Sequence, residues 1–583
     1  HYQPLAWMSF ALDWTLWGGS AERIHQVNLA LHAGLAVLVY WLFSRLLRAA
    51  APGASAAHPV GASMAAAAGA LAFAVHPLRV ESVAWATERR DLLSGLFLIA
   101  CVLAWLRRIE GGGRGWLALA LAAYAASLLS KAWGMTLPVV LLVLDVWPLR
   151  RLEGTQRPMR RLAELAVEKL PFVPFALGCA VLAATAQASD SAVVSWSEHG
   201  LAQRIAQASY GLVFYVAKTI APVRLSNLYL LELPLDPLRP VYLASMAAVV
   251  AATALLWRAR HRLPAALAAW ASYAIIASPV LGFLQSGTQE VADRYSYLAC
   301  LPLAALAGGA ALAGTIRPRW RATTWVVALA AIAALTTASW RQTLVWRDSE
   351  SLWRRAVEVQ PGSYIARHNL STALHQEGRI GEAIDEALES IRCRPGKGNE
   401  YARYHLGLLH LQRGDFERAL EAWRGALELD PGHPPSLRAA VNELGGRGRN
   451  GEAIGLLGRA LEAQPAHAWA RGELARLSLA GGDRGRAEEL WIEGLRLDGT
   501  WVAGHVGLGR LRIAQGRLAE AEASLRAALQ LGGPAVEPLV LLGRVLRATG
   551  RRQEAEACWE RALAIDPEAG EARTLLGHSR RSP

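Results

Sequence analysis

The chain has 583 residues, of which 53% are hydrophobic, and a formal net charge of +13. This length predicts at least two domains, and the apolar content excludes an intrinsically disordered protein. Five cysteines without a CxxC pair exclude a disulfide scaffold and argue against zinc and thioredoxin chemistry. Residues 1–340 hold 27 basic and 16 acidic side chains, whereas residues 341–583 hold 34 and 32. This uneven charge predicts a membrane domain and argues against nucleic-acid binding.

The first 340 residues alternate long apolar runs with short polar breaks. A helix that crosses a membrane needs about 20 mostly apolar residues. Ten segments meet or approach this length: 26–44, 63–80, 92–106, 115–130, 132–149, 170–188, 241–257, 263–284, 295–316 and 322–339. The stretch 201–221 carries several polar side chains and is predicted as an interfacial or re-entrant helix.

Ten crossings divide the connecting segments between two sides of the membrane. One side carries 17 basic and 4 acidic residues, in segments 45–62, 107–114, 150–169, 258–262 and 317–321. The other carries 10 and 11, in segments 1–25, 76–91, 189–240 and 285–294 together with Lys131. Because basic loops stay in the cytoplasm, the N-terminus and everything after residue 340 are predicted to lie outside.

Residues 341–583 repeat with a period of about 34 residues. A glycine ladder runs along Gly378, Gly414, Gly448, Gly482, Gly516 and Gly550. A second ladder runs in step with it along Pro361, Pro395, Pro431, Pro465, Gly499, Gly533 and Pro567. This pattern resembles the tetratricopeptide repeat, a helix–turn–helix unit. Six full units are predicted over 364–569, with a half-unit at 349–361 before them and a closing helix near 570–580.

Equivalent positions of the repeats hold the same kinds of residue. The second unit has Gly407 and Trp423 where the sixth has Gly543 and Trp559. Small residues let paired helices approach, and the large residue fills the remaining gap. Stacked units form a superhelix whose concave groove holds an extended peptide or a partner helix. The repeats therefore predict a site for an acceptor or partner protein and no catalyst.

Polar residues cluster in the predicted outer loop 76–91. They are His76, Arg79, Glu81, Glu88, Arg89, Arg90 and Asp91. Charged side chains near lipid are costly unless they are paired or used, so the three acids are the catalytic candidates. The alternatives are a solvated cap formed by residues 88–91 and, for His76, a helix-ending hydrogen bond.

Two other outer positions could bind a ligand. Lys131 stands alone between apolar segments, where it either binds a phosphate at the membrane surface or snorkels without function. Asp293, Arg294 and Tyr295 form either a polar site or part of an aromatic belt. His25, Asn28 and His32 share a helix face and favour interhelical hydrogen bonding over a metal, so no metal site is predicted. The common nucleotide-binding and hydrolase motifs are not found in a fitting context.

Several motifs together resemble a known family. They are HPLRVESVAW, ERRDLLSGLF, LLSK, LLVLDVWPL, EKLPF and QEVADRYSYL, in this order along residues 76–298. The chain is similar to bacterial members of the transmembrane and tetratricopeptide-repeat-containing O-mannosyltransferase group. Those proteins look like membrane glycosyltransferases of the GT-C fold.

The resemblance implies a polyprenyl-phosphate sugar donor and transfer, most simply of mannose, to a protein hydroxyl on the outer side. A carboxylate would act as base, and cations would stabilise the departing phosphate. In this sequence the cations are Lys131, Arg89, Arg90 and Arg294. The implied location is a bacterial inner membrane, with the repeats on the periplasmic side. No cofactor is predicted, and a divalent metal is neither predicted nor excluded.

The sequence departs from the family pattern at its start. The acid usual in the first outer loop has no match, and Gln3 stands where an arginine is usual. Because the chain begins at His1, an N-terminally incomplete protein is expected. The overall expectation is an all-α chain, with a polytopic GT-C-like bundle over 1–340 and an α-solenoid over 341–583. The competing interpretations are a non-enzymatic membrane-anchored scaffold for cell-envelope assembly and, third, a transporter.

Overall fold

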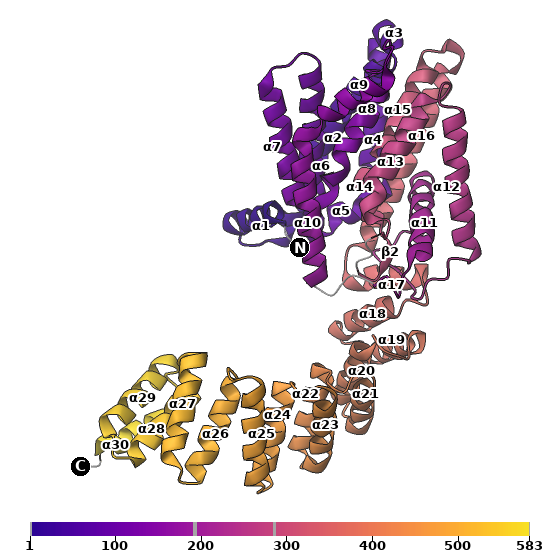
Figure 1. Cartoon of the computed structure of the whole chain (residues 1–583). Helices are drawn as coiled ribbons and strands as arrows, with labels where there is room; N and C mark the ends of the chain where they lie inside the picture. Colours follow the sequence, from indigo (N-terminus) through magenta and orange to yellow (C-terminus); the bar gives the residue numbers. More distant parts are fainter. Residues whose placement is uncertain (1–2, 190–194, 284–286, 582–583) are drawn as a thin grey trace. The chain divides into compact units, whose positions relative to one another are not determined.

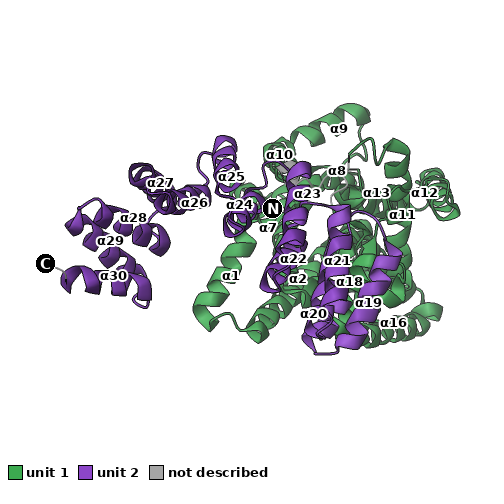
Figure 2. Ribbon diagram, turned by 90° about the horizontal axis from the view of Figure 1, so that it is seen from below, with its two compact units in different colours: residues 1–370 green, residues 371–583 purple. Residues whose placement is uncertain are grey.

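The computed structural model describes residues 3–189, 195–283 and 287–581 and confirms the all-α class (Figure 1). The strands in the described residues are β1 (Tyr229–Leu230) and β2 (Gln289–Val291), which pair antiparallel. The chain forms two compact units, His1–Leu370 and Ser371–Pro583, which Figure 2 colours separately.

The first unit is a bundle of helices joined by short 3-10 turns. Its first helices are α1 (Pro4–Trp17), α2 (Ala21–Ala50), α3 (Pro52–Ala57), α4 (Pro59–Ala74), α5 (Val80–Ala84), α6 (Arg89–Ile109), α7 (Arg114–Ser130), α8 (Leu137–Val146), α9 (Pro158–Val167) and α10 (Val173–Ser189). They are followed by α11 (Leu201–Ile220), α12 (Pro240–Arg258), α13 (Pro264–Ala277), α14 (Ser296–Ala299), α15 (Leu301–Thr315), α16 (Pro318–Val345) and α17 (Ser349–Val359). The turns are η1 (Pro77–Arg79), η2 (Ala86–Glu88), η3 (Ala132–Thr136), η4 (Leu170–Phe172), η5 (Ser278–Val280) and η6 (Asp293–Tyr295).

Ten segments of this bundle match the ten predicted spans. Among the described residues, five helices are long and apolar enough to cross a membrane, and two bent helix pairs raise the number to seven. Three shorter apolar helices, Arg114–Ser130, Ala132–Val146 and Pro264–Val280, coincide with the remaining predicted spans. The helical segments therefore agree with the sequence, and their crossing of a membrane stays a prediction.

The two bent pairs turn polar helix ends back toward the bundle. The axis bends by 55° between Pro59–Ala74 and Pro77–Ala84, and by 57° between Asp293–Ala299 and Leu301–Thr315. Proline stands in the first turn of the second member of each pair, where it cannot continue the hydrogen bonding of the preceding helix.

The long members of the two bent pairs, α4 and α15, pack closely on one another. A Cβ added to Gly69 would lie 2.9 Å from the carbonyl oxygen of Ala304, and one added to Gly308 would lie 3.0 Å from that of Ala65. Only glycine allows this approach, which is a common way for apolar helices to associate. The contact brings the bent ends of both pairs to the same end of the bundle.

The predicted helix pairs begin with α18, which contains the boundary at Leu370, and make up the second unit. The repeat helices are α18 (Tyr364–Gln376), α19 (Ile380–Cys393), α20 (Glu400–Gln412), α21 (Phe416–Leu429), α22 (Pro434–Gly446), α23 (Asn450–Ala463), α24 (Ala468–Ala480), α25 (Arg484–Leu497), α26 (Val502–Ala514), α27 (Leu518–Gly532), α28 (Val536–Ala548), α29 (Arg552–Ile565) and the closing helix α30 (Gly570–Arg581). All six glycines of the first ladder have a positive φ of 72–89°, between the helices of a pair. Glycine adopts this conformation without strain, which explains its regular spacing.

The packing expected at the small and large positions of the repeats is present. The indole Nε1 of Trp423 donates a hydrogen bond to the carbonyl oxygen of Tyr404 at 3.1 Å, and Trp559 donates in the same way to Val540 at 3.3 Å. A Cβ added to Gly407 would lie 2.2 Å from Nε1 of Trp423. The glycine thus leaves the space that the tryptophan occupies.

Candidate functional site

Six charged residues predicted from separate segments meet at one end of the bundle. Three are acids and three are cations, and we call them the charge cluster: Glu81, Glu88, Arg90, Asp91, Lys131 and Arg294. The residues come from α5, η2, the first turn of α6, the end of α7 and η6. The bends of the two helix pairs bring these segments together.

Glu88 lies at the centre of the charge cluster and is fully buried. Its carboxylate accepts hydrogen bonds from Nζ of Lys131 at 2.9 Å and from Nε of Arg90 at 3.0 Å. Nε of Arg294 lies 3.5 Å from its other oxygen. One buried carboxylate therefore holds all three cations in place.

Asp91 provides a second counterion for Lys131. Its Oδ1 accepts from Nζ of Lys131 at 2.5 Å and from the indole Nε1 of Trp133 at 2.8 Å, while Oδ2 accepts from the hydroxyl of Ser82 at 3.2 Å. Asp91 is fully buried, and these donors satisfy its two carboxyl oxygens. Trp133 was not predicted to be a site residue. The signal that could have identified it is its position two residues after Lys131, a predicted site residue.

Glu81 and Arg294 form the third part of the charge cluster. The guanidinium of Arg294 donates to Glu81 at 2.5 Å, and the backbone N–H of Arg294 donates to the same carboxylate at 2.7 Å. The guanidinium also lies over the rings of Trp85 and Tyr295, with its carbon 5.2 Å and 5.0 Å from the ring centroids. Both contacts fix the orientation of the arginine.

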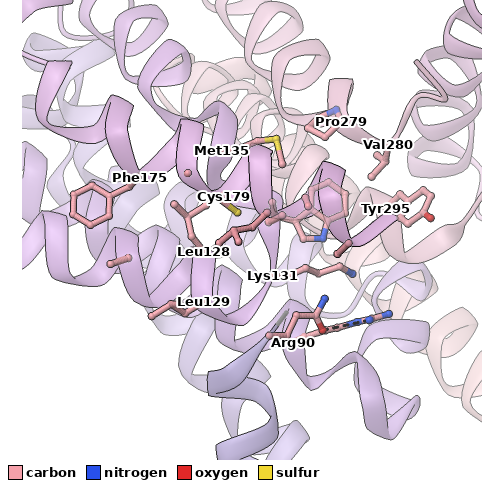
Figure 3. Close-up of a pocket in the computed structure, with 18 of the residues that line it drawn as sticks. Arg90, Leu128, Leu129, Lys131, Met135, Phe175, Cys179, Pro279, Val280 and Tyr295 are labelled. Carbon is pink, nitrogen blue, oxygen red and sulfur yellow. Dashed lines mark hydrogen bonds between the residues drawn. The ribbon is translucent and has the colours of Figure 1, made fainter. Parts of the chain in front are cut away.

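A pocket of about 830 Å³ opens beside the charge cluster (Figure 3). Arg90, Lys131 and Arg294 line it, together with Gln3 and Tyr295. Its apolar wall is formed mainly by α7 and α10 and includes Leu128, Leu129, Phe175, Cys179 and Leu182. Figure 3 shows Lys131 and Arg90 near one another, with Phe175 and Cys179 to one side. None of the described residues that line the pocket is an acid, because the three carboxylates lie behind the cations.

Arg89, the fourth predicted cation, is not among the residues that line this pocket. It is fully buried and forms an ion pair with Asp13 at 2.6 Å. Its Nε donates to the side-chain oxygen of Asn28 at 2.7 Å. Neighbouring residues on a helix point about 100° apart, so Arg90 faces the pocket while Arg89 faces α1 and α2.

The other predicted site residues make structural hydrogen bonds. His76 accepts from the backbone N–H of Leu78 at 3.2 Å, which is a helix-starting contact, and its Nε2 lies 3.0 Å from the carbonyl oxygen of Thr219. Arg79 donates to the hydroxyl of Ser296 at 3.0 Å. These residues are buried beside the pocket and do not contribute to its lining.

Asp293 is buried next to Arg294 and holds the loop before β1. Its carboxylate accepts from the hydroxyl of Tyr229 at 3.0 Å and from the backbone N–H of Ser226 at 3.2 Å. Among residues 3–189, 195–283 and 287–581, no group of three or more His, Cys, Asp or Glu is arranged to hold a metal ion. His32 bonds Tyr297 at 2.7 Å, in line with the interhelical role predicted for it.

Comparison with protein families identifies the repeats. Family models described as tetratricopeptide repeat match residues 340–398, 400–433, 446–498 and 512–578. The repeat region therefore consists of tetratricopeptide repeats. Among solved structures, the chain is similar to Pseudomonas aeruginosa pilF, with 19% identity, a TM-score of 0.30 and coverage of 37% of this chain and 97% of that one.

Comparison with curated proteins finds protein O-mannosyl-transferases as relatives over a partial stretch. The chain is 33% identical to the protein O-mannosyl-transferase TMTC4 of Homo sapiens over 156 residues, which cover 25% of this chain and 21% of that protein. It is 29% identical to the protein O-mannosyl-transferase tmtc2 of Xenopus laevis over 160 residues, which cover 27% and 18%. The chain thus spans about a fifth of the length of these relatives. The chain contains tetratricopeptide repeats and has distant homology to protein O-mannosyl-transferases over a partial stretch.

Proposed function

We propose that the chain is a membrane glycosyltransferase that moves a sugar, in the simplest case mannose, from a polyprenyl-phosphate donor to a protein hydroxyl. The observation that carries this proposal is the pocket, where Arg90, Lys131 and Arg294 stand at one end of an apolar wall. A lipid-linked phosphate has the same division into an anionic head and an apolar chain. The partial homology to protein O-mannosyl-transferases supports the same reaction class.

The three cations suit a phosphate that gains charge during the reaction. In the transfer, the bond between the anomeric carbon and the phosphate oxygen breaks, the acceptor oxygen bonds to that carbon, and the hydroxyl proton passes to solvent. Negative charge then develops on the departing phosphate. Donors that are already fixed stabilise such charge without reorganising, and Glu88 fixes all three cations here.

The three acids act in this proposal as counterions and not as the base. Each carboxylate is bonded to at least one cation of the charge cluster and lies behind the pocket lining. A buried cation without a counterion costs several kcal/mol, so these acids keep the anion site charged and assembled. In this proposal the charge cluster and the pocket serve the donor half of the reaction.

The repeats are proposed to hold the acceptor or a partner protein. Tetratricopeptide units present a concave groove to extended peptides or helices. A groove tethered to the transferase raises the effective concentration of the bound acceptor near the pocket. With the predicted orientation, this would take place on the periplasmic side of a bacterial inner membrane.

The test is transfer by the full chain in vesicles from polyprenyl-phosphate mannose carrying a radiolabel. We expect Lys131→Gln to lower transfer and donor binding at least tenfold, or about 1.4 kcal/mol, because it removes a positive charge from the donor-phosphate site. The control is Lys397→Gln, a change of the same charge in an exposed turn of the repeats. Wild-type protein that neither binds nor uses any polyprenyl-phosphate sugar would favour the scaffold interpretation.

A further inference from the structure

The first helix, α1, has exposed aromatic and apolar side chains around most of its surface. Trp7 and Trp14 are 66% and 67% exposed, and Met8, Leu12 and Leu16 are similarly open. A helix that is apolar on all sides is normally buried. We therefore expect the exposed side chains of α1 to be covered by something other than this chain. Figure 1 shows α1 lying crosswise to α7, at the end of the bundle where α5 and α14 also lie.

We propose that α1 is an interfacial helix, embedded in the lipid headgroup region of the membrane leaflet next to the pocket. Its 14 residues would extend about 21 Å, which is too short to cross the hydrocarbon core of about 30 Å. Tryptophan is the side chain most suited to the membrane–water interface, and α1 carries Trp7, Trp14 and Trp17. The helix belongs to the same unit as the predicted membrane spans, so lipid is the phase nearest to it.

A buried ion pair fixes α1 to the bundle. Asp13 is the only charged residue of α1, is 4% exposed and pairs with Arg89 at 2.6 Å. The guanidinium carbon of Arg89 lies 4.4 Å from the centroid of the Phe10 ring, and its Nη2 donates to the carbonyl oxygen of Ile24 at 3.1 Å. With Asp13 neutralised inside the protein, the exposed surface of α1 carries no charge. Arg89 is therefore a positioning residue for α1.

This arrangement predicts how α1 recognises lipid. Each basic residue near an anionic membrane surface contributes about 1 kcal/mol of attraction, and α1 has no Lys or Arg. Its insertion is therefore expected to depend on the tryptophans and to be independent of anionic lipid. Gln3 precedes α1, and its side-chain oxygen accepts a hydrogen bond at 3.4 Å from Arg90, which lines the pocket. The position of α1 in the membrane therefore also sets the depth of the pocket relative to the lipid headgroups.

The experiment is photolabelling of the full chain in vesicles by a lipid that carries a diazirine close to its headgroup, followed by mass spectrometry. We expect peptide 4–17 to be labelled equally in pure phosphatidylcholine and in phosphatidylcholine with phosphatidylglycerol. The repeat helix α23, whose buried face lies in the repeat core, serves as the unlabelled control within the same chain. This readout does not require transferase activity, so it stands or falls separately from the proposed function.

Two variants sharpen the result. Replacing Trp7 and Trp14 together by Gln should lower the labelling of peptide 4–17 severalfold, while a melting curve verifies the fold. Arg89→Gln should leave the tryptophans in lipid but loosen the helix, and thereby increase proteolysis around residues 18–20. Absence of label on peptide 4–17, labelling that requires anionic lipid, or cross-linking of α1 to α1 of a second copy would overturn the proposal.

Discussion

Removing Lys131 tests whether the charge cluster is held together by its internal ion pairs. Its ammonium bridges two fully buried carboxylates, at 2.9 Å from Glu88 and 2.5 Å from Asp91. In Lys131→Met the chain loses this bridge but keeps a side chain of similar length. Glu88 retains Arg90 as a counterion, whereas Asp91 retains only the uncharged donors of Trp133 and Ser82.

The expected cost follows from leaving the buried Asp91 without its cation. Removing one partner of a buried ion pair typically costs about 3–5 kcal/mol. Because Lys131 is 14% exposed and Asp91 keeps two hydrogen bonds, we expect the lower end, about 3 kcal/mol. The neutral amide of Asp91→Asn needs no counterion, so the double variant Lys131→Met/Asp91→Asn should recover about 1–3 kcal/mol of this loss.

The assay is the free energy of unfolding of the detergent-solubilised full chain, from titration with sodium dodecyl sulfate followed by circular dichroism. Lys397→Gln, which changes the same charge in an exposed turn, should be neutral within about 0.5 kcal/mol. The reasoning is refuted if Lys131→Met is equally neutral, or if the double variant loses the sum of both single effects. Either result would mean that Asp91 does not depend on Lys131.

Two further predictions concern the repeats and strand β2 beside the pocket. Gly407→Ala places a Cβ 2.2 Å from Nε1 of Trp423 and should destabilise the repeats by about 1–3 kcal/mol. A Cβ added to Gly455 meets nothing within 4 Å, so Gly455→Ala should stabilise the repeats by up to about 1 kcal/mol. Equal melting temperatures of the two variants would contradict this prediction. Burial raises the pKa of Glu290 from 4.5 to about 7, so the folded chain holds this proton at a pH where the unfolded chain has lost it. Stability should therefore fall as pH rises from about 4.5 to about 7, and Glu290→Gln should flatten that fall in melting curves; an unchanged pH slope would count against the burial of this carboxyl.

The repeats could be predicted from the sequence because their structure is local. Each helix pair is encoded within about 34 residues, and the left-handed turn between its helices requires a residue such as glycine. The positions of Gly407 and Trp423 could be paired by comparison with Gly543 and Trp559, because the unit is repeated. The sequence showed the glycine ladder but did not identify its cause. The structure shows that these glycines have positive φ angles, so the turn and not helix packing explains their spacing.

The residues of the charge cluster could also be named from the sequence, because charges beside long apolar runs are unusual. Their roles could not be assigned in the same way. Arg89 and Arg90 are adjacent and identical in type, yet one pairs with Asp13 and the other lines the pocket. Which side of α6 faces the pocket depends on the helices packed around it, and no local pattern records this.

Chain length, apolar runs and the 34-residue period therefore determine the helices, the two kinds of region and the polar positions between them. Tertiary structure alone decides that Glu81 meets Arg294 across 213 residues and that Glu88 meets Lys131 across 43. These pairings arise from two bent helix pairs and from the close contact of Gly69 and Gly308 between α4 and α15. Ion pairs between distant segments follow from packing, because a charge in the sequence specifies its cost of burial but not the partner that compensates it.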